Sequence, residues 1–188
     1  MGAIVGKMFG IVVGVVFVLS SAVAAAQTVS DSQTGLAVTP PPGYTAKAAP
    51  SRGRYTAVIE VKSDRDRDTG CRVAFHPIAQ NSGLNQAQIN VLAGTTERRA
   101  VIESTLGTLY QVTAIDQVEH ARVRGSVATA TLKLLPGIPA RASDMISVFY
   151  LLETPPGRTM IVCVSEKQAL IQRRNEFDAL LAGVTLPR

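Results

Sequence analysis

Two apolar segments joined by a tight turn constrain the fold of this chain more than any other feature. Val148–Leu152 and Met160–Val164 are almost continuously apolar, and Thr154-Pro155-Pro156-Gly157 lies between them. Proline fixes φ and glycine permits the turn, so the sequence predicts a β-hairpin over 145–153 and 158–164. Apolar strands without alternation are typical of a strand buried on both faces. We therefore expect this hairpin at the centre of a sheet, covered on both sides.

The rest of the chain predicts further strands with helices between them. The expected strands cover 36–38, 55–61, 72–78, 111–123 and 126–135, the last two turning at Arg124-Gly125; the expected helices cover 84–94, 95–109 and 165–183. Adjacent strands joined by short loops favour antiparallel pairing. The order strand, hairpin, helix, hairpin, hairpin, helix indicates an α+β fold, an antiparallel β-sheet packed by helices.

The helix boundaries follow from capping signals. Asn85 with Gln88 and Ser165 with Gln168 have the spacing of capping boxes. Gly94 either breaks or bends the helical stretch between 84 and 109, and the sequence leaves this open. The periodicity assigns buried and outward positions as follows: Leu84, Ala87, Val91, Leu92, Val101, Ile102, Leu106 and Leu109 inward, Arg98 and Arg99 outward, and Leu170, Phe177, Leu180 and Leu181 as the apolar stripe of the last helix.

This pattern resembles the PsbP-like α/β/α sandwich. The resemblance rests on the Leu36–Tyr44 opening with its Pro-x-Gly-aromatic end, the mid-chain helix, the Val118–Leu135 pair, and the closing hairpin and helix with Phe177 and Leu181. It covers about residues 35–186. The superfamily includes photosystem accessory proteins, Ran-binding proteins and small bacterial envelope proteins. The resemblance implies an accessory or binding role without a shared active site, and it transfers no functional residues.

The N-terminus has the pattern of a secretory signal. Lys7 precedes an apolar stretch over 8–19, and Ala24 and Ala26 fit the A-x-A rule for cleavage before Gln27. The sequence thus predicts a cleavable signal peptide over 1–26, a flexible lead over 27–34 and a single domain over 35–188. No Cys lies beside the cleavage position, so no stable membrane anchor is expected after cleavage. Retention of the N-terminal segment as an uncleaved helix is the alternative.

Cys71 and Cys163 are the only two cysteines. Two thiols in one small exported domain favour a disulfide. The bond requires the strand that begins at Cys71 to lie close to the strand that contains Cys163. Two separate buried thiols are the alternative.

The chain is mildly basic, with a formal net charge of +5. The excess lies in five arginine pairs: Arg52 and Arg54, Arg65 and Arg67, Arg98 and Arg99, Arg122 and Arg124, Arg173 and Arg174. Arginine binds carboxylate and phosphate bidentately, although a mixed solvated surface explains most such pairs. His120 alternates with Arg122 and Arg124, so on one strand the three would share a face and form a candidate anion site. Nucleic acid is not an expected partner of an exported protein.

No catalytic motif stands out. His76 and His120 are the only histidines, so a triad-type mechanism would need one of them. The alternating acids Asp64, Asp66 and Asp68 imitate a calcium loop, but the spacing lacks the glycine and glutamate that an EF-hand requires. No zinc site is expected, because too few ligands remain once the cysteines pair. The sequence predicts no metal and no cofactor.

Together these observations predict a non-enzymatic binding or accessory protein of the bacterial cell envelope, periplasmic or secreted. The expected partner is an envelope protein or an anionic envelope component. The alternative is an envelope hydrolase with a Ser or Thr nucleophile and His76 or His120 as its base.

Overall fold

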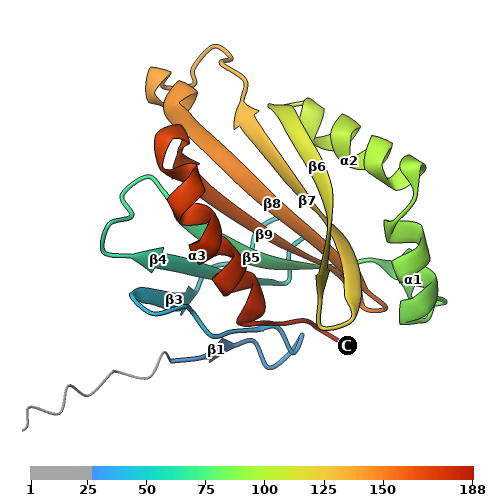
Figure 1. The fold of residues 1–188 in the computed structure, drawn as a ribbon. Coiled ribbons are helices and arrows are strands. Elements are labelled where there is room, and N and C mark those ends of the chain that lie inside the picture. The colour runs from blue at the N-terminus through green and yellow to red at the C-terminus, as the bar shows by residue number, and fades with distance from the viewer. Residues whose placement is uncertain (1–26) are drawn as a thin grey trace, which may run out of the picture.

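A computed structural model describes residues 27–188, and the predicted signal peptide over 1–26 lies outside this part. Seven antiparallel strands form the main sheet in the order β3-β4-β5-β9-β8-β7-β6 (Figure 1). Their bounds are β3 Tyr44–Ala48, β4 Ala57–Ser63, β5 Gly70–Pro77, β6 Tyr110–His120, β7 Val123–Leu132, β8 Met145–Thr154 and β9 Gly157–Glu166. The α+β antiparallel sheet with packed helices is therefore confirmed.

The hairpin predicted around Pro155-Pro156 lies at the centre of this sheet. β8 and β9 pair along their whole length, from Met145 opposite Glu166 to Thr154 opposite Gly157. Along β9, buried and half-buried residues alternate. One face of the hairpin is fully covered, but the expectation of full burial on both faces is wrong for β9. Its apolar residues on the second face are partly open to solvent.

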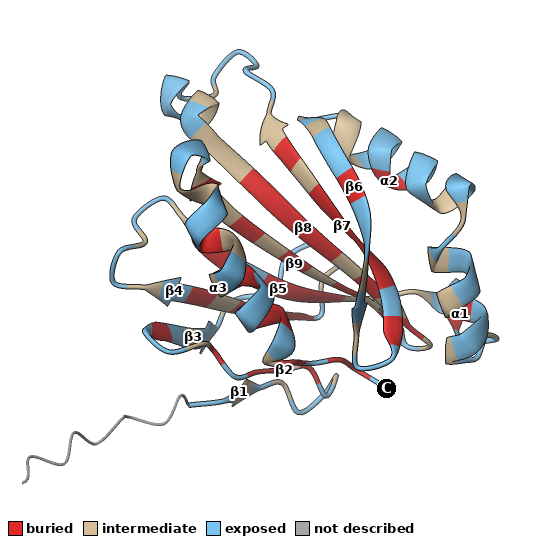
Figure 2. Cartoon of the chain, in the orientation of Figure 1, coloured by how far each residue is buried: buried red, intermediate tan, exposed pale blue. Residues whose placement is uncertain are grey.

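The covered face packs against α3 (Leu170–Ala182) and a second, smaller sheet (Figures 1 and 2). This small sheet joins β1 (Val29–Ser30), β2 (Ala37–Val38) and β10 (Val184–Thr185). Its residues, with Phe177, Leu180 and Leu181 of α3, close the larger of two apolar clusters. The predicted flexible lead over 27–34 is corrected here, because Val29 and Ser30 pair with Val38 and Ala37.

The second face is covered by helices over only part of its width. α2 (Thr96–Gly107) packs on β6, and α1 (Gln86–Ala93) packs on β7 and β8. Ile102 and Leu106 of α2 meet Ile115, Ala128 and Phe149 in the smaller apolar cluster. No helix of the described residues covers β4 and β5 on this side.

Helix boundaries follow the caps only in part. The Asn85–Gln88 capping box is present, and Thr95 caps a separate α2, so Gly94 ends one helix rather than bending a longer one. The predicted Ser165–Gln168 box is wrong, because Ser165 is a buried residue of β9 and α3 begins at Leu170 after a short 3₁₀ turn.

The inward face assigned to α1 is also wrong. Ile89 is its buried residue, whereas Val91 and Leu92 are 69% and 52% exposed. Val101 and Leu109 are exposed as well, while Ile102 is buried as predicted.

Candidate functional site: the open face of the sheet

The uncovered half of the second face forms a shallow groove with an apolar floor. Val58 of β4 lies opposite Ala74 of β5, which lies opposite Met160 of β9. Val162 and Val164 continue the floor along β9, and both are only half-buried. Because side chains alternate along a strand, these residues all point away from α3. The apolar residues of β9 from which the sequence predicted burial on both faces are therefore partly exposed in the groove.

Loops on both sides give the groove its depth. The 49–55 segment forms one wall with Ala49, Pro50, Arg52 and Tyr55, and the tip of the β4–β5 hairpin forms another. Tyr55 packs edge-on against His76, with ring centroids 6.3 Å apart. The groove is open to solvent and holds about 740 Å³, which is enough for several residues of a peptide.

Basic side chains outnumber acidic ones around this groove. Glu60 and Arg72 form an exposed ion pair across neighbouring strands on the floor. Next to the groove, a smaller pocket opens between α2 and the 49–55 segment, and Tyr55 and Met160 line both. The charged residues lining the two are Arg52, Arg54, Lys62, Arg72, Arg98 and Arg158 against Glu60 and Asp68.

The disulfide predicted from the two cysteines is present beneath the opposite face. Cys71 and Cys163 occupy directly paired positions of β5 and β9, with Cα atoms 4.1 Å apart. Both residues are buried in the larger apolar cluster. The bond ties together strands that are distant in the sequence, at the middle of the sheet.

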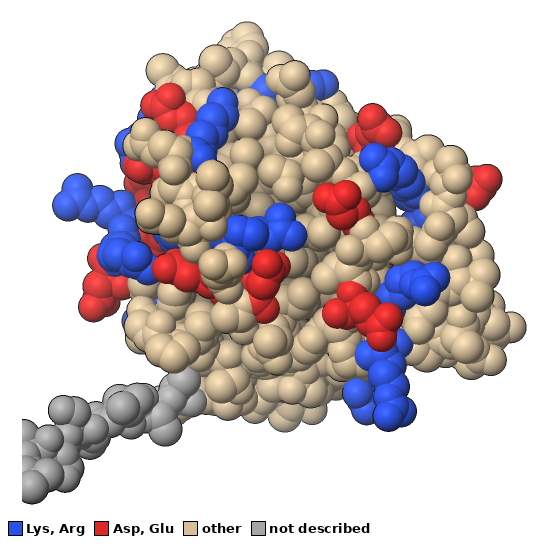
Figure 3. Space-filling model, viewed as in Figure 1, with Lys and Arg blue, Asp and Glu red and all other residues tan. Residues whose placement is uncertain are grey.

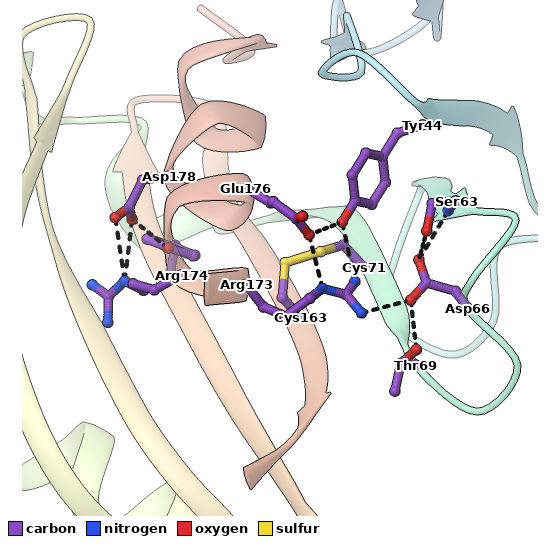
Figure 4. The surroundings of a disulfide bond; sticks show 11 residues. Tyr44, Ser63, Asp66, Thr69, Cys71, Cys163, Arg173, Arg174, Glu176 and Asp178 are labelled. Atoms are coloured by element: carbon purple, nitrogen blue, oxygen red, sulfur yellow. Dashed lines mark hydrogen bonds and ion pairs between the residues drawn. A yellow bond between two sulfur atoms is a disulfide. The ribbon is translucent and has the colours of Figure 1, made fainter. Parts of the chain in front are cut away.

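Beside the disulfide lies a buried ionic network that the sequence analysis missed (Figure 4). The Nη1 of Arg173 lies 2.9 Å from Oδ1 of Asp66, whose side chain is fully buried. The Nε of Arg173 lies 2.9 Å from Oε2 of Glu176, and the Nη2 of Arg173 donates to the hydroxyl of Tyr44 at 3.1 Å. The Tyr44 hydroxyl itself donates to Glu176. Asp66, the central acid of the calcium-like tip, is therefore engaged by an arginine.

Burial and hydrogen bonding shift the ionisation of this network. Burial, followed by the hydrogen bond to Glu176, raises the pKa of Tyr44 to about 12. Burial alone would also raise the pKa of Asp66, but hydrogen bonds from Ser63, Thr69 and Arg173 outweigh it and lower the pKa. The network therefore consists of a neutral tyrosine and ionised partners at neutral pH, and its geometry fastens the β4–β5 tip to α3.

The proposed anion site at His120, Arg122 and Arg124 is not assembled as the sequence predicted. The turn falls at Ala121 and Arg122, which have φ of 51° and 65°, so it lies three residues earlier than expected. His120 pairs with Val123, whereas Arg124 pairs with Glu119, which places His120 and Arg124 on opposite faces of the hairpin. His120 bonds the carbonyl of Val184 at 2.6 Å, while the backbone of Arg124 bonds Asn90 of α1.

The two histidines make hydrogen bonds to backbone carbonyls. Nδ1 of His76 lies 3.2 Å from the carbonyl oxygen of Arg54, and Nε2 of His120 contacts that of Val184. Within residues 27–188 neither ring is bonded to a Ser or Thr hydroxyl. In the same range no group of three or more His, Cys, Asp and Glu side chains is arranged to hold a metal, and no helix is long and apolar enough to cross a bilayer.

The two arginines of a sequence pair differ in their burial and in their partners. Arg173 is buried, and Arg98 is half-buried in an ion pair with Glu153, which corrects its expected outward position. Arg99 donates to the carbonyl of Ile115. On the face that carries α3, charged side chains of both signs are interspersed (Figure 3). A continuous basic patch is not seen on that face.

Comparison with known proteins identifies the architecture. No protein-family model matches the chain, and no curated protein sequence matches it significantly. Among solved structures, the solution structure of cyanobacterial PsbP (CyanoP) from Synechocystis sp. PCC 6803 superposes with a TM-score of 0.56 and 8% sequence identity. The match covers 89% of this chain and 95% of that one. The chain therefore has the PsbP-like fold that its sequence pattern indicated.

Proposed function

We propose that the protein is a non-enzymatic accessory protein that acts outside the cytoplasm and binds a polypeptide partner in the groove on its open sheet face. The observation that carries this proposal is the apolar floor of the groove, where Met160, Val162 and Val164 of β9 are half-exposed beside buried Val58 and Ala74. Exposed contiguous apolar surface on a folded domain is typical of a binding site. The open half of the second face of the seven-stranded sheet supplies such a surface.

Two observations support a location outside the cytoplasm. The N-terminal sequence has the pattern of a secretory signal, and Cys71 and Cys163 form a disulfide. Disulfides persist in oxidising compartments such as the bacterial periplasm. A periplasmic or secreted site of action in the bacterial envelope is part of the proposal.

Charge favours a partner with acidic side chains. Six basic residues and two acidic residues line the groove and the adjoining pocket, and Glu153, which pairs with Arg98 and Arg158, adds a third acid beside them. Complementary charge accelerates encounter and orients the partner, while apolar contacts on the floor supply the larger share of affinity. Raised salt is therefore expected to weaken capture by screening the basic rim.

The test compares capture of envelope proteins by the wild type and two variants. Val162→Lys places a charge on the groove floor, whereas Ile171→Lys changes an 88% exposed apolar residue on α3, on the other side of the sheet. We expect one or more acidic proteins to be retained by the wild type and by Ile171→Lys, and to be lost with Val162→Lys and at raised salt.

Retention of the same proteins by Val162→Lys would contradict the groove as the binding surface. Binding to vesicles of anionic lipid that Val162→Lys abolishes would replace the polypeptide partner by a membrane. Activity-based labelling of one Ser or Thr, lost on changing His76 or His120, would establish the hydrolase alternative instead.

A further inference from the structure

A small pocket at one end of the groove combines apolar walls with three arginines. It lies between α2 and the 49–55 segment and holds about 70 Å³, roughly the share of two water molecules at ~30 Å³ each. Val101, Ile102 and Leu106 of α2 face Leu151 and Met160 of the sheet across it. The remaining lining is Arg54, Tyr55, His76, Arg98, Thr105 and Arg158.

The arginines of this pocket have too little negative charge to balance them. Arg98 and Arg158 both pair with the single carboxylate of Glu153, and the Nη2 of Arg158 lies 2.6 Å from its Oε1. The side chains of Arg98, Arg158 and Glu153 are largely buried, with exposed fractions of 23%, 27% and 16% respectively. Within residues 27–188 Arg54 makes no ion pair. The two largely buried arginines thus share one negative charge, and exposed Arg54 adds a further positive charge at the solvent side of the pocket.

The electrostatic cost of this arrangement is visible in the arginines themselves. Burial, followed by the charge of Arg158, lowers the pKa of Arg98 to about 10. Burial and then the charge of Arg54 lower the pKa of Arg158. An incoming anion would relieve this mutual repulsion, because an opposite charge nearby favours the charged form of each guanidinium.

We propose that this pocket binds the C-terminal residue of the polypeptide partner, with the terminal carboxylate at the arginines and an aliphatic side chain between α2 and Met160. This inference rests on the proposed function and names the end of the partner that anchors it. Guanidinium groups bind carboxylate bidentately, and Val101, Ile102 and Leu106 offer an apolar wall.

A chain terminus suits the pocket better than an internal acidic residue. A C-terminal aliphatic residue carries its carboxylate and its side chain on the same carbon, Cα. The end of the side chain can therefore enter this small pocket while the carboxylate stays at its rim beside Arg54. An internal Asp or Glu carries its carboxylate on a side chain, and the aliphatic group must then come from another residue. Since Tyr55 and Met160 line both cavities, the preceding residues of the partner continue into the groove.

The test uses N-acetyl-leucine as the probe and N-acetyl-leucinamide as its uncharged match. Titration of each into the isotope-labelled protein is followed by NMR of the methyl groups of Ile102, Leu106 and Met160. We expect saturable shifts of these methyls with N-acetyl-leucine and none with the amide. Arg54→Gln should weaken binding roughly tenfold, the worth of one charge-assisted hydrogen bond, whereas Arg52→Gln, which changes a groove residue outside the pocket, should not.

A second variant acts in the opposite direction. Glu153→Gln removes the carboxylate that competes for Arg98 and Arg158, so it should tighten binding of N-acetyl-leucine. Equal binding of acid and amide, or no effect of Arg54→Gln, would overturn the proposal. Inorganic phosphate that matches N-acetyl-leucine in affinity would do the same, because it would show an anion site that ignores the aliphatic group.

The experiments can refute the C-terminal subsite and the proposed function independently of each other. If N-acetyl-leucine does not bind while capture remains sensitive to Val162→Lys, the subsite is overturned and the groove stands. If N-acetyl-leucine binds while Val162→Lys leaves capture unchanged, the groove proposal is overturned and the pocket stands.

Discussion

Arg173 shows how a single charged residue is accommodated inside this domain. Its side chain lies over the ring of Phe177, 5.3 Å from the centroid, and its guanidinium reaches Asp66, Glu176 and Tyr44. Burying an ion pair is costly, and the pair is tolerated because hydrogen bonds satisfy most of its polar atoms. Loss of one partner leaves the other charge buried and unpaired.

Arg173→Met is therefore expected to destabilise the protein by about 3–5 kcal/mol, since it leaves Asp66 buried without its cation. Arg65→Met is the control, because Arg65 pairs with Glu176 through a side chain that is 66% exposed, and exposed ion pairs add little to stability. Urea unfolding measures both free energies. Equal losses for the two variants would show that burial of the network adds nothing.

Asp66 gives the network a pH dependence whose sign is fixed by its lowered pKa. The folded-state pKa lies below the unfolded value of about 3.9, so the carboxylate stabilises the fold above that pH and the contribution is lost as the pH falls through the folded pKa. The stability gap between the wild type and Asp66→Asn should be large near neutral pH and narrow in acid. A gap of constant size would contradict the assignment.

Sequence reasoning found the disulfide but not this network, for a physical reason. The predicted oxidising compartment and the presence of just two cysteines favour a bond between Cys71 and Cys163. Nothing in the sequence distinguishes the neighbouring residues Arg173 and Arg174. Only tertiary packing distinguishes them: Arg173 is buried, and Arg174 forms a partly exposed pair with Asp178. Asp66 is hidden in the same way among the alternating charges of a hairpin tip.

At the scale of elements, long periodic segments were predictable and short ones were not. β8 and β9 follow from their apolar runs, and the capping box of α1 from Asn85 and Gln88. β1 and β10 have two residues each, too few to show a period, and the equally short β2 is the exception, since it lies within the strand predicted over 36–38. The groove escaped prediction because an apolar strand half open to solvent has the same composition as one buried on both faces.

Gly125 is required by close packing between two strands, which its sequence context does not indicate. It reads as a turn residue, yet it lies within β7, where an added Cβ would sit 2.3 Å from the carbonyl oxygen of Leu151. Gly125→Ala should thus destabilise the β7–β8 pairing by about 1–3 kcal/mol through overpacking.

Gly107 at the end of α2 is the matched position, because nothing lies within 4 Å of a Cβ placed there. Gly107→Ala should leave stability unchanged or raise it by about 0.5–1 kcal/mol. Thermal unfolding of both variants checks the contrast. A Gly125→Ala protein as stable as the wild type would show that β7 and β8 can separate to admit a methyl group.

At the scale of the whole molecule, helices cover the two faces of the sheet unequally. α3 and the small sheet cover most of one face and leave Ala114 and Asp116 of β6 exposed, whereas α1 and α2 leave the β4 and β5 side of the other face open. The same architecture is shared with cyanobacterial PsbP at 8% identity, so element order and alternation specify it rather than particular residues. For that reason the fold was predictable from the sequence, while the open groove required the positions of α2 and the 49–55 segment.

The two ends of the described chain meet in the small sheet, and this predicts how its stability is distributed. Val184 pairs with Val38, and Val184 and Leu186 are each 4% exposed against the larger cluster. Removal of residues 184–188 uncovers β2 and forfeits about 1.5–3 kcal/mol for each of these two aliphatic side chains. Removal of exposed Arg188 alone is the control and should cost little.

Hydrogen exchange then locates the loss. Amides of β2 should lose protection when 184–188 are removed, because β10 no longer pairs with Val38 and Ala37. Amides of β8 and β9 should stay protected, since the disulfide and both neighbouring strands remain in place. Uniform loss of protection across all strands would instead show that the small sheet and the main sheet unfold as one cooperative unit.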